Sequence, residues 1–161
     1  MPDPTHLRDR SHSAAALEGL LHPVTLAALA VWVVNDHLLK GAGPGWLTGK
    51  LSDVACLAVV PWMPLVGYVL ITRADLSRRW LVRSCVLTGL VMLTINLFDG
   101  AAWAYRHGLA ALQWPFAQLG ASLRCNGLAP WRPVQLTMDA TDLWTLPALL
   151  LPLRLWREES P

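Results

Sequence analysis

Residues 24–53 read VTLAALAVWVVNDHLLKGAGPGWLTGKLSD, and this stretch decides the fold class. Residues 24–34 form an apolar run, a polar cluster and a glycine-rich segment follow, and the chain becomes apolar again at Leu51. A membrane-spanning helix needs about 20 mainly apolar residues. Because glycine and proline at 41–45 break a helix, the pattern predicts two membrane helices joined by a tight hairpin.

The composition of the whole chain agrees with a membrane protein. Hydrophobic residues make up 54% of the 161 residues and charged residues 15%, whereas charged residues are about 25% of soluble domains. Nine tryptophans suit membrane interfaces, and a formal net charge of +2 is too small to indicate nucleic acid as a partner. We therefore expect membrane lipids, and another membrane protein, as partners.

The predicted fold class is all-α: an integral membrane bundle of four spans in a single domain, 1–161. The predicted spans are about 20–40, 51–72, 80–98 and 141–156, with a flexible N-terminus, 1–13. His22-Pro23 either starts the first span or kinks a longer helix. Pro61 and Pro64 free backbone carbonyls in the second span, which favours the interior of the bundle.

The segment 100–139 is predicted to be a long external loop. Within it, residues 109–123 are moderately apolar but are interrupted by Gln113, Pro115 and Gln118. This segment is too polar and too short for a typical span, so we predict an interfacial or re-entrant helix in preference to a fifth span.

The distribution of basic residues predicts the orientation. Eight of them lie in the N-terminal segment, the connector 73–83 and the C-terminal tail, against five on the other side. Basic residues concentrate on the cytoplasmic side of membranes, so both termini are predicted to be cytoplasmic.

In this topology, polar residues gather at the extracytoplasmic ends of all four spans. Pairs of them are spaced three or four residues apart, which places each pair on one helical face. The predicted polar pocket consists of Asn35, Asp36, His37, Lys40, Lys50, Asp53, Asn96, Asp99, Asp139 and Asp142. Since five carboxylates outweigh two lysines, this pocket should attract cations.

One hypothesis is therefore a divalent cation as cofactor. Carboxylate and amide oxygens suit Ca²⁺, Mg²⁺ or Mn²⁺, and an imidazole admits Zn²⁺. The candidate ligands are Asp36, His37, Asp53, Asp99 and Asp139. Such a site would act on or recognise a lipid or envelope component from the outer side. Activation of water beside a lysine, on a lipid-linked phosphate, is one such reaction, although no nucleophile motif such as GxSxG is present.

Two other functions use the same residues. In the first, the chain is a noncatalytic membrane partner whose polar pairs lock helix packing: Asp36 pairs with Lys40, Lys50 with Asp53, and Asp139 or Thr141 caps the last helix. In the second, the pocket belongs to a cation or proton path. Transport is less favoured because the span interiors, for example 86–94, lack ionisable groups.

The three cysteines do not indicate a metal site, because no CxxC spacing is present. Cys56 and Cys85 lie in apolar runs and should behave as small hydrophobic residues. Cys125 lies in a polar segment, either free or paired in a disulfide.

The string 35–40, NDHLLK, followed by PGWLTGKLSD at 44–53, resembles a pattern in uncharacterised bacterial multi-span membrane proteins. The resemblance covers about the first third of the chain, with 139–143 as a later match. It implies a location in the bacterial inner (cytoplasmic) membrane, and it does not imply any activity. The chain is not assigned to the VanZ-like family, because Cys56 stands where that family has a histidine three residues after the aspartate at Asp53.

Overall fold

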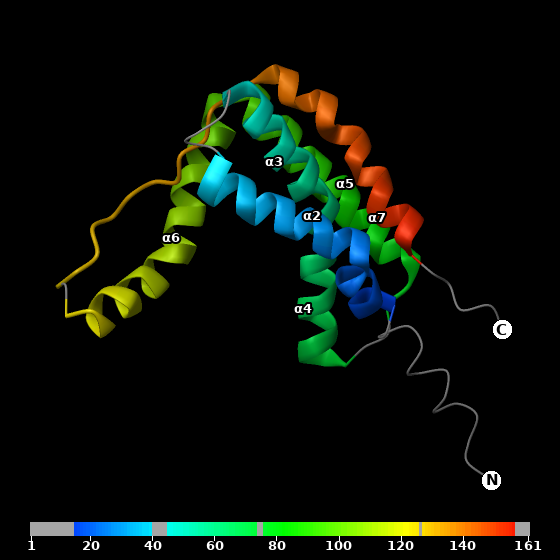
Figure 1. Ribbon diagram of the computed structural model, residues 1–161, viewed down its shortest axis with the longest axis horizontal. Coiled ribbons are helices and arrows are strands. Elements are labelled where there is room, and N and C mark those ends of the chain that lie inside the picture. Colours follow the sequence, from blue (N-terminus) through cyan, green and yellow to red (C-terminus); the bar gives the residue numbers. More distant parts are fainter. Residues whose placement is uncertain (1–14, 40–44, 74–75, 126, 157–161) are drawn as a thin grey trace, which may run out of the picture. The chain divides into compact units, whose positions relative to one another are not determined.

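The computed structural model describes residues 15–39, 45–73, 76–125 and 127–156, and the regular structure within these ranges is helical (Figure 1). The predicted all-α class is therefore confirmed. Two compact units are present: unit 1 comprises Met1–Leu90 and Trp144–Pro161, and unit 2 comprises Val91–Leu143. The N-terminus predicted to be flexible, 1–13, lies outside the described residues.

The first predicted span is a bent helix in unit 1. Ala15–Leu21 is followed by α2 (Pro23–Val34) and by a π-helix, Asn35–Leu39, and the two halves of this pair meet at 49°. The break falls at His22, whose Nδ1 accepts a hydrogen bond from the Val24 amide at 3.3 Å. Because Pro23 lacks an N–H group, it fits the first turn of α2. The structure combines the two alternatives for His22-Pro23, because α2 begins at Pro23 and is also bent by 49° from the preceding Ala15–Leu21.

The second predicted span is longer than expected and is also broken. It consists of α3 (Gly45–Val59) and α4 (Trp62–Thr72), so it begins at Gly45 instead of residue 51. Pro61 is fully buried at the break, and its carbonyl accepts a hydrogen bond from the Ser84 hydroxyl at 2.8 Å. A neighbouring helix thus satisfies a carbonyl at the proline break, as expected for an interior position.

The third predicted span is confirmed as a helix, α5 (Arg78–Leu97), whereas the fourth differs from the expectation. Its range holds a 3₁₀-helix, Ala140–Leu149, and then the short α7 (Leu150–Leu155). Pro147 and Pro152 remove donors from the i→i−4 ladder, which favours the tighter 3₁₀ turn. By length and hydropathy, the described helices supply two membrane spans, Gly45–Thr72 and Arg78–Leu97, and a third if the bent pair is one span. Four spans are thus not clearly present among them.

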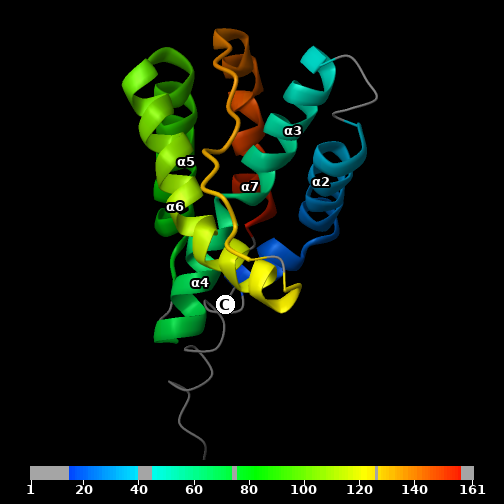
Figure 2. The same cartoon turned by 90° about the vertical axis from the view of Figure 1, so that its left-hand side faces the viewer.

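The core of unit 1 is built around an aromatic stack. The Trp62 ring is fully buried and lies parallel to the Trp156 ring, with centroids 6.1 Å apart and planes 6° apart. Leu65 and Val69 of α4 pack into the same cluster, together with Cys85. A second packing interface in unit 1 lies between α2 and α3, which pack side by side as a hairpin (Figures 1 and 2).

Unit 2 is one long helix with a returning strap. The helix, α6 (Asp99–Leu123), has 25 residues and continues through Pro115, so the helix predicted within 109–123 begins ten residues earlier than expected. Residues 127–139, which we call the strap, are not helical and run back along α6. The Gln118 side chain exchanges two hydrogen bonds with the Ala129 backbone, at 2.8 and 3.1 Å. The Arg106 guanidinium donates to the Leu136 carbonyl at 2.6 Å.

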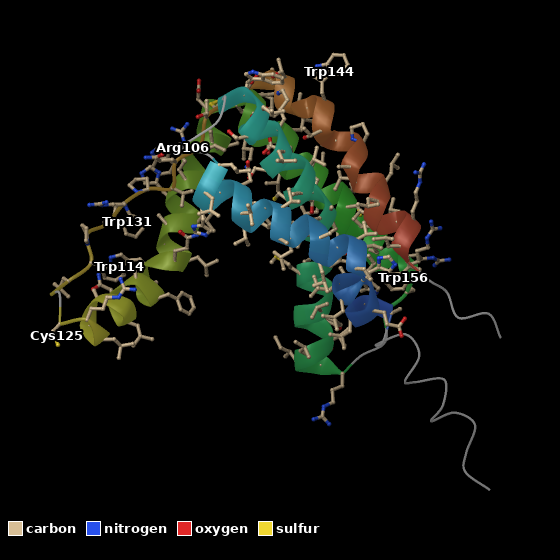
Figure 3. The ribbon with its side chains drawn as sticks, in the orientation of Figure 1. Arg106, Trp114, Cys125, Trp131, Trp144 and Trp156 are labelled. Carbon is tan, nitrogen blue, oxygen red and sulfur yellow. The ribbon has the colours of Figure 1, made fainter. Side chains whose placement is uncertain are left out.

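The strap also makes an aromatic contact with α6. Figure 3 shows Trp114 and Trp131 close together, and their ring centroids are 6.4 Å apart. Because an isolated proline inside a helix costs stability, these contacts help to explain why α6 is uninterrupted at Pro115.

Candidate functional site

The best-defined polar site joins α2 and α3 through Asp36. One carboxylate oxygen, Oδ1, accepts a hydrogen bond from the Ser52 hydroxyl of α3 at 2.5 Å. The other, Oδ2, accepts from the indole Nε1 of Trp32 at 3.1 Å, one turn earlier on α2. Asp36 is thus held from its own helix and from the neighbouring helix at once. Hydrogen bonds to a carboxylate are stronger than those between neutral groups.

Asn35 makes a second bond between the same helices. Its amide Nδ2 donates to the Thr48 carbonyl at 2.7 Å, and the side chain is fully buried. Its carbonyl Oδ1 is also buried and accepts no hydrogen bond from any described residue. The amide cannot be turned over to relieve this, because Oδ1 would then face the Thr48 carbonyl.

The local backbone explains how adjacent residues both reach α3. Asn35 and Asp36 lie at the start of the π-helix, whose i→i+5 bonds widen the turn. On α3, Thr48 and Ser52 are four residues apart and therefore lie on one face. Sequence analysis missed Ser52 and Trp32 as partners of Asp36, although the four-residue spacing of Trp32 from Asp36 was visible in the sequence.

The other predicted pocket residues of unit 1 divide into two groups. Lys50 and Asp53 are half-buried on α3, and both Asp53 and Asp36 interact electrostatically with the Cys56 thiol. His37 is exposed, and Lys40 lies outside the described residues. Trp32 and Ser52 are partners of Asp36 among the described residues, and the predicted pair with Lys40 stays a prediction.

The predicted pocket residues of unit 2 make contacts within that unit. The side-chain oxygen of Asn96, Oδ1, accepts a hydrogen bond from the Asp139 backbone amide at 3.1 Å. This bond connects the strap to the end of α5. The Asp139 carboxylate accepts from the Thr141 amide at 2.8 Å, which confirms Asp139 as the cap of the following helix. Asp99 and Asp142 lie in the first turns of their helices, where a negative charge is favoured.

These contacts favour packing over chemistry. Across the described ranges, no group of three or more His, Cys, Asp or Glu side chains is arranged to hold a metal ion. Each of the bonds described above instead connects a helix to a neighbour, to its own preceding turn or to the strap.

Comparison of the chain with protein-family models, with curated proteins and with solved structures finds no match.

Proposed function

We propose that this protein is a noncatalytic subunit of a bacterial inner-membrane assembly, and that its polar residues lock helices together. The observation that carries the proposal is the pair of bonds from Asn35 and Asp36 to Thr48 and Ser52. Lipid tails provide no hydrophobic drive between membrane helices, so such bonds help to set which helices pair.

The outer faces of the helices suit this role. Large apolar side chains remain exposed on the described helices, for example Leu70 and Ile71 on α4 and Val86, Leu87 and Leu90 on α5. Exposed apolar surface of this extent is unfavourable in water, and it matches lipid tails or the apolar helices of another membrane protein.

The proposal includes a topology for the chain in the membrane. We infer four passes across the membrane, with the bent pair as the first and residues 141–156 as the last, and with both termini cytoplasmic. The arginines that begin α5, Arg78 and Arg79, support this orientation. The resemblance of residues 35–53 to bacterial multi-span proteins supports the location.

The size of the protein in native membranes tests the proposal. Membranes that express the chain at its natural level are extracted in a mild detergent and separated on a native gel. We expect a defined complex containing one other membrane protein, and Ser52→Ala should lower the amounts of chain and complex together. A chain that runs alone, or an Asp36→Asn variant that is abundant and assembled yet reproduces the phenotype of a gene deletion, would refute a noncatalytic packing role.

A second candidate function, a cation site, rests on the buried Asn35 oxygen. This oxygen lies on the residue next to Asp36 and lacks a hydrogen-bond donor among the described residues. A hard cation binds both amide and carboxylate oxygens. Metal analysis of the purified protein decides between the candidates. A stoichiometric divalent ion that is lost in Asp36→Asn and Asp53→Asn, but kept in the exposed control Asp99→Asn, would favour the cation site. Absence of metal, with no effect of added ions on thermal stability, leaves the packing role.

A further inference from the structure

An open hollow in unit 1 combines two arginines with an apolar wall. Its volume is about 520 Å³, and it is lined by Arg78 of α5, by Arg154, Leu150 and Leu153 of α7, and by Trp156. A hollow of this size is within the range of small-ligand sites. It lies away from Asp36 and Ser52, so the polar site between α2 and α3 does not explain it.

The charge at this hollow favours an anion. The two guanidinium groups come from different helices, and neither forms an ion pair with a described carboxylate. Arg78 is also the first residue of the 20-residue α5, whose N-terminus carries a partial positive charge. Arginine is the side chain best suited to phosphate, because its fork of N–H groups matches the phosphate oxygens.

The walls of the hollow favour a lipid over a free anion. Leu150 is 52% exposed beside the arginines, which provides a surface for an acyl chain. Trp156, seen at the end of α7 in Figure 3, is buried and fixed by its stack on Trp62, so the floor of the hollow is rigid. A ligand that satisfies both surfaces carries a phosphate and a hydrocarbon chain.

Aromatic residues near the start of α5 place this hollow at the level of the lipid headgroups. The Trp80 ring stacks on Tyr68, with centroids 6.0 Å apart, and the Arg83 guanidinium lies 5.1 Å from the centroid of Trp80. Tryptophan and tyrosine concentrate where the membrane meets water. Arg83 is thus engaged by an aromatic ring, whereas Arg78 lines the hollow.

We propose that the hollow between α5 and α7 binds the phosphate of an anionic phospholipid, with Arg78 and Arg154 on the phosphate and Leu150 against an acyl chain. Basic pockets between membrane helices bind anionic headgroups in this way. Retention of an anionic lipid here would connect the start of α5 to α7.

Native mass spectrometry of the full chain in detergent tests the site. The protein is titrated with short-chain phosphatidylglycerol, with phosphatidylcholine of the same chain length, and with glycerol 3-phosphate. We expect one phosphatidylglycerol to bind in preference to phosphatidylcholine, and glycerol 3-phosphate to compete only weakly. Each Arg→Gln change should weaken this preference about fivefold, and the Arg78→Gln/Arg154→Gln double variant about 25-fold.

Arg79→Gln is the matched control, because it removes the same charge one residue away and outside the lining of the hollow. It should keep the preference of the unmodified chain. Equal losses in Arg79→Gln and Arg78→Gln would show a diffuse charge effect and overturn the site. Equal competition by glycerol 3-phosphate would overturn the lipid assignment. If the double variant does not fold, the unmodified chain is titrated at increasing salt concentration instead. A preference for phosphatidylglycerol that does not weaken with salt would contradict binding by the arginines.

Discussion

Gly19 allows the tightest contact in the core of unit 1, and replacing it with alanine should destabilise the protein. A Cβ atom built on Gly19 would lie 2.1 Å from Cη2 and 2.2 Å from Cζ3 of the Trp62 ring. Ordinary contact begins at 3.4 Å, so the ring would have to move by about 1.3 Å. The ring is fully buried and stacked on Trp156, so such a movement would disturb the packing of the core.

The expected cost of Gly19→Ala follows from two opposing terms. Overpacking a rigid core costs about 1–3 kcal/mol, and the fixed ring places this site near the upper value. Alanine in place of glycine inside a helix raises the free energy of unfolding by about 1 kcal/mol. We therefore expect the free energy of unfolding to fall by about 2 kcal/mol.

The matched control is Gly67→Ala on α4. No atom lies within 4 Å of a Cβ built there, so only the helix term applies, and the variant should be more stable by up to about 1 kcal/mol. The assay is equilibrium unfolding in mixed micelles, followed by tryptophan fluorescence, which responds to separation of Trp62 from Trp156. The packing described for unit 1 would be wrong if Gly19→Ala were as stable as Gly67→Ala.

Two further predictions concern the cysteines and the strap of unit 2. In intact cells, a membrane-impermeant maleimide should label the exposed Cys125 and leave the buried Cys85 unlabelled; strong labelling from outside of a cysteine engineered at Arg78 would reverse the proposed orientation. Gln118→Ala removes two hydrogen bonds to Ala129, together about 2 kcal/mol, so hydrogen exchange at the Ala129 amide should become about 30-fold faster. Unchanged exchange at Ala129 would show that Gln118 does not hold the strap.

Apolar length and helix breakers were sufficient to predict much of the fold. The hairpin at 41–45, the third span and the kink options at His22-Pro23 depend on local features, namely hydrophobic runs, glycine and proline. The last span could not be predicted in the same way. Hydropathy gives the length of residues 141–156, but it does not show that the prolines in this range favour a 3₁₀-helix over Ala140–Leu149.

The continuity of α6 was also hidden from the sequence. Gln113, Pro115 and Gln118 interrupt the apolar run, yet Gln118 uses its polar group on the strap, eleven residues further along the chain. Such a contact depends on where the chain returns, and hydropathy carries no information on this.

For the candidate site, sequence spacing predicted polar residues on helix faces but did not identify Ser52 and Trp32 as partners of Asp36. Pairing was inferred within one helix, whereas Asp36 bonds Ser52 across the hairpin. The π-helix at Asn35–Leu39 is the reason that two adjacent residues both reach α3, and no simple sequence pattern marks a π-helix.

The most direct test of the central claim, that Asp36 locks α2 to α3, is a double-mutant cycle of Asp36→Asn and Ser52→Ala. The free energy of unfolding of both single variants and the double variant is measured in mixed micelles, and Asp36→Asn is also combined with Thr88→Val as a control. Thr88 bonds only the Ser84 carbonyl of its own helix among the described contacts, so the control pair should be additive. We predict a coupling between Asp36 and Ser52 of about 0.6 to 1.7 kcal/mol, which are the average and the maximum for hydrogen bonds between membrane helices. A coupling indistinguishable from that of the control pair would contradict the account.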